Sequence, residues 1–123
     1  MGIRFLKLAV VYLFIGASLG LIMGITQKFT LAPVHAHLVL LGWASLALAG
    51  LIYHHYPAAA STRLARYHFW LHNLGLPVFM IALGLVLSGV EAAGPLLGIA
   101  ATTVLVGLAL FTTNVLVNVK AQS

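Results

Sequence analysis

The segment APVHAHLVLLGWASLALAGLIYHHYP, residues 32–57, decides how this chain folds. Its centre is a predominantly apolar stretch, a pair of histidines stands near each end, and a proline closes it. An apolar run of about 20 residues is long enough to cross a bilayer as one helix. We therefore predict a transmembrane helix over residues 33–56, with Pro33 in its first turn and Pro57 as its stop.

The same pattern recurs through the rest of the chain. Of its 123 residues, 63% are hydrophobic, six are Lys or Arg and one is Asp or Glu. Three further apolar runs predict helices over residues 5–26, 67–90 and 95–119. The expected fold class is an all-α, four-helix transmembrane bundle that forms a single domain over residues 1–123. The chain has no cysteine, which excludes disulfides, iron–sulfur clusters and thiolate metal sites.

The basic residues predict the orientation of the bundle. Four spans place both termini and the middle loop on one side, whereas Lys28 and Glu91 lie on the other. By the positive-inside rule we expect cytoplasmic termini in a multi-pass protein of the bacterial inner (cytoplasmic) membrane. Nucleic acid is not an expected partner, because the basic residues form no continuous stripe. The residues on the cytoplasmic side are Arg4, Lys7, Arg63, Arg66 and Lys120.

His35 and His37 are the principal candidate site residues. Successive residues of a helix turn by about 100°, so positions i and i+2 point about 200° apart at nearly the same depth. The two imidazoles cannot bind one ion from within one helix, but they can serve two sites on opposite flanks. Neutral imidazole is a common axial ligand of haem iron. The alternative is that both side chains only form hydrogen bonds to neighbouring helices.

The other four histidines are expected toward the cytoplasmic end of the bundle. His54, His55 and His68 are predicted to lie at the membrane interface, where imidazole is solvated. His72 lies one turn deeper, and a hydrogen-bonded packing role is favoured over a ligand role. A histidine-lined channel for protons or metal ions is a further hypothesis for this group.

Small and polar residues predict contacts between helices. Gly16, Gly20 and Gly24 align on one face, which indicates either a seam between copies of the chain or close packing inside it. Asn114 and Asn118 share a face near the inner end of the last helix. Interhelical hydrogen bonding is their expected role, and contact with a quinone or a respiratory partner is the alternative.

Two segments resemble a known family. HAHLVLLGWASLALAGLIYHHYP, residues 35–57, resembles the tenth transmembrane helix of subunit I of the haem–copper oxidases and nitric oxide reductases. LARYHFWLHNLGLPVFMIALGL, residues 64–85, resembles the eleventh helix of the same family, with its HFW opening. The order of the two helices and their connecting loop agree as well.

The resemblance implies a haem b protein assembled from several copies. In that family the residue matching His35 ligates the high-spin haem, and the residue matching His37 ligates the low-spin haem. The family's twelve helices form three arcs of four, and this chain resembles one arc. A homotrimer would then hold haem iron at each interface, between His35 of one subunit and His37 of its neighbour. Lys28 either pairs with the haem propionates or faces solvent.

Departures from the family pattern limit the activity that the resemblance implies. The segment VFMIALGLVLSGV, residues 78–90, carries no histidine for a copper site, and the proton-channel acids of the oxidases are missing. A complete oxidase is therefore not expected, and no catalytic residue is assigned. Bis-histidine haem implies electron transfer or sensing of redox state or a gas. The alternative is a haem-free membrane scaffold or assembly factor for respiratory complexes.

Overall fold

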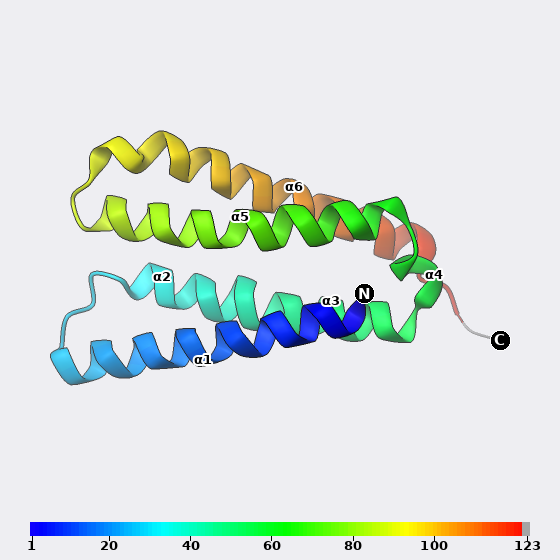
Figure 1. Ribbon diagram of the computed structural model, residues 1–123, viewed down its shortest axis with the longest axis horizontal. Coiled ribbons are helices and arrows are strands. Elements are labelled where there is room, and N and C mark those ends of the chain that lie inside the picture. The colour runs from blue at the N-terminus through cyan, green and yellow to red at the C-terminus, as the bar shows by residue number, and fades with distance from the viewer. Residues whose placement is uncertain (122–123) are drawn as a thin grey trace.

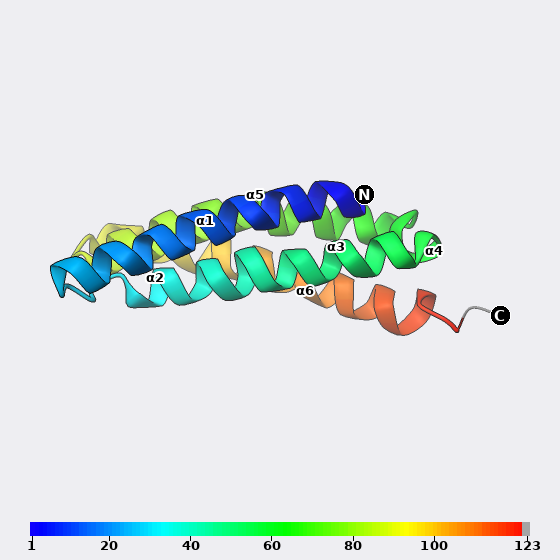
Figure 2. The same cartoon turned by 90° about the horizontal axis from the view of Figure 1, so that it is seen from below.

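The computed structural model, which describes residues 1–121, is a bundle of long helices (Figures 1 and 2). Four segments are long and apolar enough to cross a membrane: Gly2–Thr26, Ala32–His55, Arg63–Leu87 and Glu91–Asn118. No strand occurs in the described residues. The predicted all-α bundle with four membrane-spanning helices is thereby confirmed, and the protein is a multi-pass membrane protein by the length and composition of its helices.

The second span is divided into three parts. It consists of α2 (Ala32–His37), a π-helical turn η1 (Leu38–Ala44) and α3 (Ser45–His55). The sequence predicted one uninterrupted α-helix here, so the π-helical turn is a correction. The remaining elements are α1 (Gly2–Thr26), the short α4 (Pro57–Ala60), α5 (Arg63–Leu87), the 3₁₀ turn η2 (Glu91–Ala93) and α6 (Gly94–Asn118).

Local chemistry explains where the helices begin and end. Helix α1 ends at Thr26, because the next residue, Gln27, adopts the left-handed conformation at φ 55°. Helix α5 begins at Arg63 rather than at the predicted residue 67, because the Thr62 side chain accepts a hydrogen bond from the Ala65 amide at 3.1 Å. It ends at Leu87 rather than at residue 90, before Gly89, whose φ of 99° no helix continues through.

The four spans form two helical hairpins. Helix α1 packs along the second span, and α5 packs along α6 over much of its length (Figure 1). Contacts between α2 and α5 join the hairpins. Helix α1 begins and α6 ends toward the same end of the bundle, which is called the inner end below (Figure 2). Gly2 and Gly50 let the first hairpin close tightly there, since a Cβ on Gly2 would lie 2.5 Å from the Gly50 carbonyl oxygen.

The buried interior is thin and falls into two clusters. An inner cluster is centred on Phe5, Leu46 and Tyr53, and an outer cluster on Val34 and Leu76. Large apolar side chains cover the outside of all four spans instead. This distribution is typical of helices surrounded by lipid, because lipid chains are as apolar as these side chains and burial away from them brings no hydrophobic gain.

Candidate functional site

His35 packs against helix α1 at Gly16 and Gly20. Its Nδ1–H donates to the carbonyl oxygen of Gly16 at 2.7 Å, which is a short hydrogen bond between two different spans. The ring lies directly against Gly20, where a Cβ would come within 2.8 Å of the His35 Cε1 atom. Only glycine leaves this space, so the side chain and the helix face fit each other closely.

His37 lies on the other side of the same helix. Its Nδ1–H donates to the carbonyl oxygen of Pro33, one turn earlier, at 2.7 Å. Its ring meets Phe79 of α5 edge-on, with 5.3 Å between the ring centroids. His35 therefore contacts α1 while His37 contacts α5, and the two imidazoles occupy different flanks, as the 100° step per residue predicts.

Both rings present the same nitrogen to the surroundings. A carbonyl oxygen only accepts, so in each neutral ring Nδ1 carries the proton and Nε2 keeps its lone pair. Neither Nε2 atom has a hydrogen-bond partner among the described residues. The one fully buried side-chain nitrogen or oxygen without a partner in that part of the chain is Asn73 Oδ1, so neither Nε2 atom is fully buried. A second hydrogen bond that fixes tautomer and ring direction is typical of metal-ligating histidine.

The flanking helices supply no third ligand. Within residues 1–121, no three His, Cys, Asp or Glu side chains come close enough to hold a metal ion together. Each histidine therefore offers one coordinating nitrogen by itself, on its own flank of the second span.

No family model, curated protein or solved structure matches this chain.

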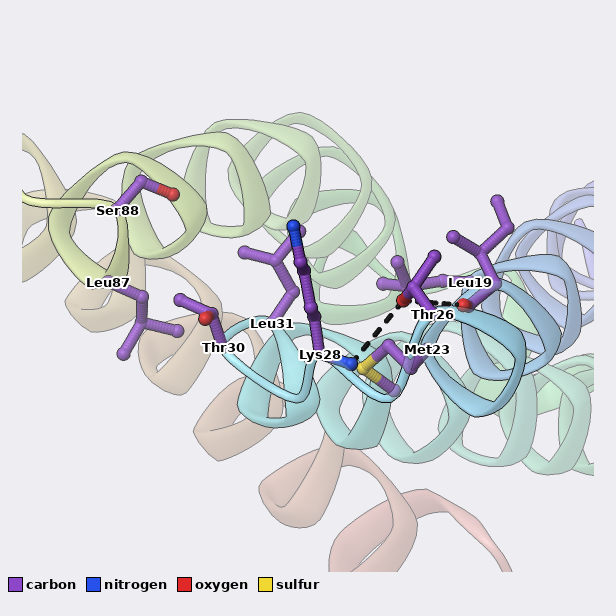
Figure 3. A pocket seen from close by; sticks show the side chains of 9 residues that line it. Leu19, Met23, Thr26, Lys28, Thr30, Leu31, Leu87 and Ser88 are labelled. Carbon is purple, nitrogen blue, oxygen red and sulfur yellow. Dashed lines mark hydrogen bonds between the residues drawn. The ribbon is translucent and has the colours of Figure 1, made fainter.

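Lys28 belongs to a different part of the molecule. It lies in the loop after α1 and borders an open hollow of about 590 Å³ at the outer end, which Leu87 of α5 and the following Ser88 also line (Figure 3). Neither His35 nor His37 lines this hollow. The structure therefore does not bring the three predicted haem-binding residues together in one cavity.

Two of the three glycines in the α1 stripe pack against the second span. A Cβ on Gly16 would lie 3.1 Å from Val39 Cγ2, and Gly20 accommodates the His35 ring. Both glycines therefore pack inside the chain, against the second span. Nothing lies within 4 Å of the position of a Cβ on Gly24. The interpretation as packing within the chain thus holds for two of the three positions.

A hydrogen-bonded chain of side chains runs through the inner half of the bundle. The Tyr53 hydroxyl lies 2.9 Å from His68 Nδ1, and His68 Nε2 lies 3.2 Å from His72 Nδ1. His72 Nε2 lies 2.8 Å from the carbonyl oxygen of Leu41. The side chains of His68 and His72 are fully buried. The predicted interfacial, solvated position of His68 is therefore wrong, whereas His72 has the expected hydrogen-bonded packing role.

The burial of His68 comes from residues distant in the sequence. Phe5 stacks against its ring with centroids 5.1 Å apart, and Phe111 lies at 4.8 Å. The sequence pattern of α5 alone gives no sign of these neighbours. His54 and His55, in contrast, are exposed.

One asparagine of the α6 pair forms the expected contact between elements, and the other forms a hydrogen bond within α6. Asn114 Nδ2 donates to the carbonyl oxygen of Ala59 in α4 at 3.0 Å, and Asn118 Nδ2 donates to Asn114 Oδ1 at 2.8 Å. Asn114 is fully buried. Its amide therefore ties the short inner helix to the end of the last span, which confirms the predicted interhelical hydrogen bond for Asn114, whereas Asn118 bonds only within its own helix.

Proposed function

We propose that this chain is a membrane-embedded haem b protein that holds the haem iron through His35 and His37. One observation carries the proposal: both rings donate Nδ1–H to a backbone carbonyl and keep an unpartnered Nε2, on opposite flanks of the second span. An axial histidine that ligates through Nε2 needs this tautomer, and a second hydrogen bond at Nδ1 is typical of metal-ligating histidine. The donor set of two neutral imidazoles also suits iron in a porphyrin, which itself supplies four nitrogens.

The opposite flanks require a second copy of the chain. One span cannot offer both histidines to one iron, because the rings point about 200° apart. The second axial ligand must come from another subunit, with His35 of one copy facing His37 of the next. Such a contact is heterologous and closes after a fixed rotation, and a homotrimer, resembling the twelve-helix core of the oxidases, is the assembly that we favour.

The chemistry that haem supplies when bound is reversible one-electron transfer at iron. The residues of this chain hold and orient the two imidazoles, and the surrounding apolar helices exclude water. Lys28 at the outer end remains a candidate partner for carboxylates at the membrane surface. We place both termini in the cytoplasm and the protein in the bacterial inner membrane, from the distribution of its basic residues. Electron transfer and sensing of redox state or a gas are the roles that follow.

Absorption spectroscopy of the purified protein tests the proposal. Protein made with ample haem should show a Soret band, which His35→Ala and His37→Ala should each abolish. The matched control is His54→Ala, an exposed histidine of the same span, which should keep the band. A colourless wild-type protein would instead support the haem-free scaffold or assembly factor.

Mixed subunits test the assembly. Co-expression of His35→Ala and His37→Ala subunits should restore part of the low-spin spectrum, because some interfaces then carry two intact ligands. Neither variant alone should show it. A mixed sample whose spectrum equals the sum of the two single variants would rule out ligation between subunits.

A further inference from the structure

The second span changes its hydrogen-bond register next to the buried chain of side chains. The Ser45 amide bonds the carbonyl oxygen of Leu40, five residues back, as in a π-helix. From Ser45 onward the helix is α-helical again, with amides bonded four residues back. A change from a spacing of five to four leaves one carbonyl over, and Leu41 occupies that junction.

The leftover carbonyl is supplied with a donor from another span. His72 Nε2–H of α5 donates to the Leu41 oxygen at 2.8 Å. In the hydrocarbon core no water replaces such a donor, so this bond satisfies a group that would otherwise be costly to bury. The π-helical turn of one span is thus satisfied by one side chain of another.

The partners of His72 determine which of its nitrogens carries the proton. Since the Leu41 oxygen only accepts, a neutral His72 accepts at Nδ1, where His68 Nε2–H donates. His68 Nδ1 then accepts from the Tyr53 hydroxyl. All three bonds point the same way, from Tyr53 to Leu41, and every ring nitrogen of the chain is used.

Helix α6 closes this region against water. A Cβ on Gly107 would lie 3.3 Å from the His72 backbone nitrogen and 3.2 Å from Leu71 Cβ. The absence of a side chain at Gly107 therefore lets α6 lie directly against the turn that carries both buried histidines. The tautomers are fixed by protein groups alone.

We infer that His72 is a positioning residue that holds the π-helical turn and so sets the direction of the His35–His37 pair. The π-helical turn adds one residue to a helical turn, which rotates everything before it by about 100° relative to a continuous α-helix. With that rotation, His35 meets Gly16 and Gly20 of α1. Without it, the pair would point about a quarter of a turn or more away. The consequence for ligation rests on the proposed function, but the consequence for the turn does not.

Hydrogen exchange of the protein in lipid nanodiscs tests the inference without haem. His72→Leu removes the donor, and the backbone amides of residues 42–46 should exchange about 3- to 30-fold faster, as expected for loss of one hydrogen bond in a membrane. His72→Gln keeps an N–H donor at similar reach and should exchange like the wild type. The matched control is Asn73→Leu, because that side chain donates only to Phe69 of its own helix. It should leave residues 42–46 unchanged.

A second variant covers the case in which His72→Leu does not accumulate. His72→Asn keeps a polar amide but is too short to reach Leu41, so it should show the same faster exchange. Wild-type exchange in both the Leu and the Asn variants would overturn the inference. Equal acceleration in His72→Gln and His72→Leu would also overturn it, because the donor would then not matter.

Haem-loaded protein adds a second readout. His72→Leu should give a mixture of low-spin and high-spin absorption, whereas His72→Gln should keep the low-spin spectrum. A wild-type protein that binds no haem, together with faster exchange in His72→Leu, would end the proposed function and leave the role of His72 in the π-helical turn intact. A wild-type protein that binds haem, with unchanged exchange and spectra in His72→Leu, would overturn the role of His72 and leave the proposed function intact.

Discussion

Substitution of Gly20 by alanine tests the contact between the His35 ring and helix α1. The new Cβ would lie 2.8 Å from His35 Cε1 and 3.3 Å from Nδ1. Carbon atoms in contact are normally about 3.5–4.0 Å apart, so the ring must retreat by about 0.7 Å. The same shift would lengthen the 2.7 Å bond to the Gly16 oxygen to about 3.4 Å, beyond the normal range for such bonds. The substitution should therefore break the bond that fixes the tautomer.

The effect on folding should be small, and the effect on haem large. Alanine favours a helix over glycine by about 1 kcal/mol, and the lost hydrogen bond costs about 0.5–1.5 kcal/mol. The two nearly cancel, so the free energy of unfolding should change by less than about 1 kcal/mol. Loss of the hydrogen bond behind a ligating histidine lowers affinity by about 10- to 100-fold, and we expect haem binding to fall by that factor.

Gly24→Ala is the matched control, because it lies one turn further along α1 with nothing within 4 Å of its Cβ position. The ¹⁵N chemical shifts of the His35 ring measure the tautomer in haem-free protein, and an absorbance titration measures haem affinity. Gly20→Ala should alter both, while Gly24→Ala should alter neither. Identical ¹⁵N shifts of the His35 ring in Gly20→Ala and the wild type would refute the claim that Gly20 leaves the space in which His35 bonds the Gly16 oxygen.

Two further substitutions probe the bonds that hold the spans together. Thr62→Ala removes the N-cap of α5 and should lower the free energy of unfolding by about 1 kcal/mol, measured by titration with a denaturing detergent. The control Thr102→Val replaces an exposed threonine of α6 and should leave that free energy unchanged. Asn114→Leu removes the buried amide that donates to the Ala59 oxygen and should cost about 0.5–1.5 kcal/mol, because the Thr62 hydroxyl still donates to that oxygen at 2.8 Å. Asn118→Leu leaves the bond to Ala59 in place but removes the donor to the buried Asn114 Oδ1, so it should cost about 1–3 kcal/mol, and an unchanged free energy of unfolding in both variants would contradict this assignment.

The sequence was sufficient for those features that depend on neighbours along the chain. Apolar run length located all four spans, and the helical repeat placed His35 and His37 on different flanks. The tautomer of His35 could not be predicted, because the Gly16 carbonyl that fixes it is 19 residues away on another span. The burial of His68 was missed for the same reason, since Phe5 and Phe111 come from other helices.

The π-helical turn left a weaker trace in the sequence. Side-chain propensities barely distinguish a π-helical turn from an α-helix, so a continuous apolar run predicts the commoner form. The one local hint is Gly42, inside the turn, where a Cβ would come within 2.6 Å of the Tyr12 ring. That contact explains the glycine only once both spans are placed.

Because α1 begins and α6 ends toward the same end of the bundle, the four-span unit can be joined to further copies of itself. A short linker from the end of one unit to the start of the next would not have to cross the bilayer, and every unit would keep its orientation. Gene duplication could therefore convert separate subunits into one long polypeptide without inverting any of them. After such a fusion the repeats could diverge independently, each with its own histidines to keep or lose.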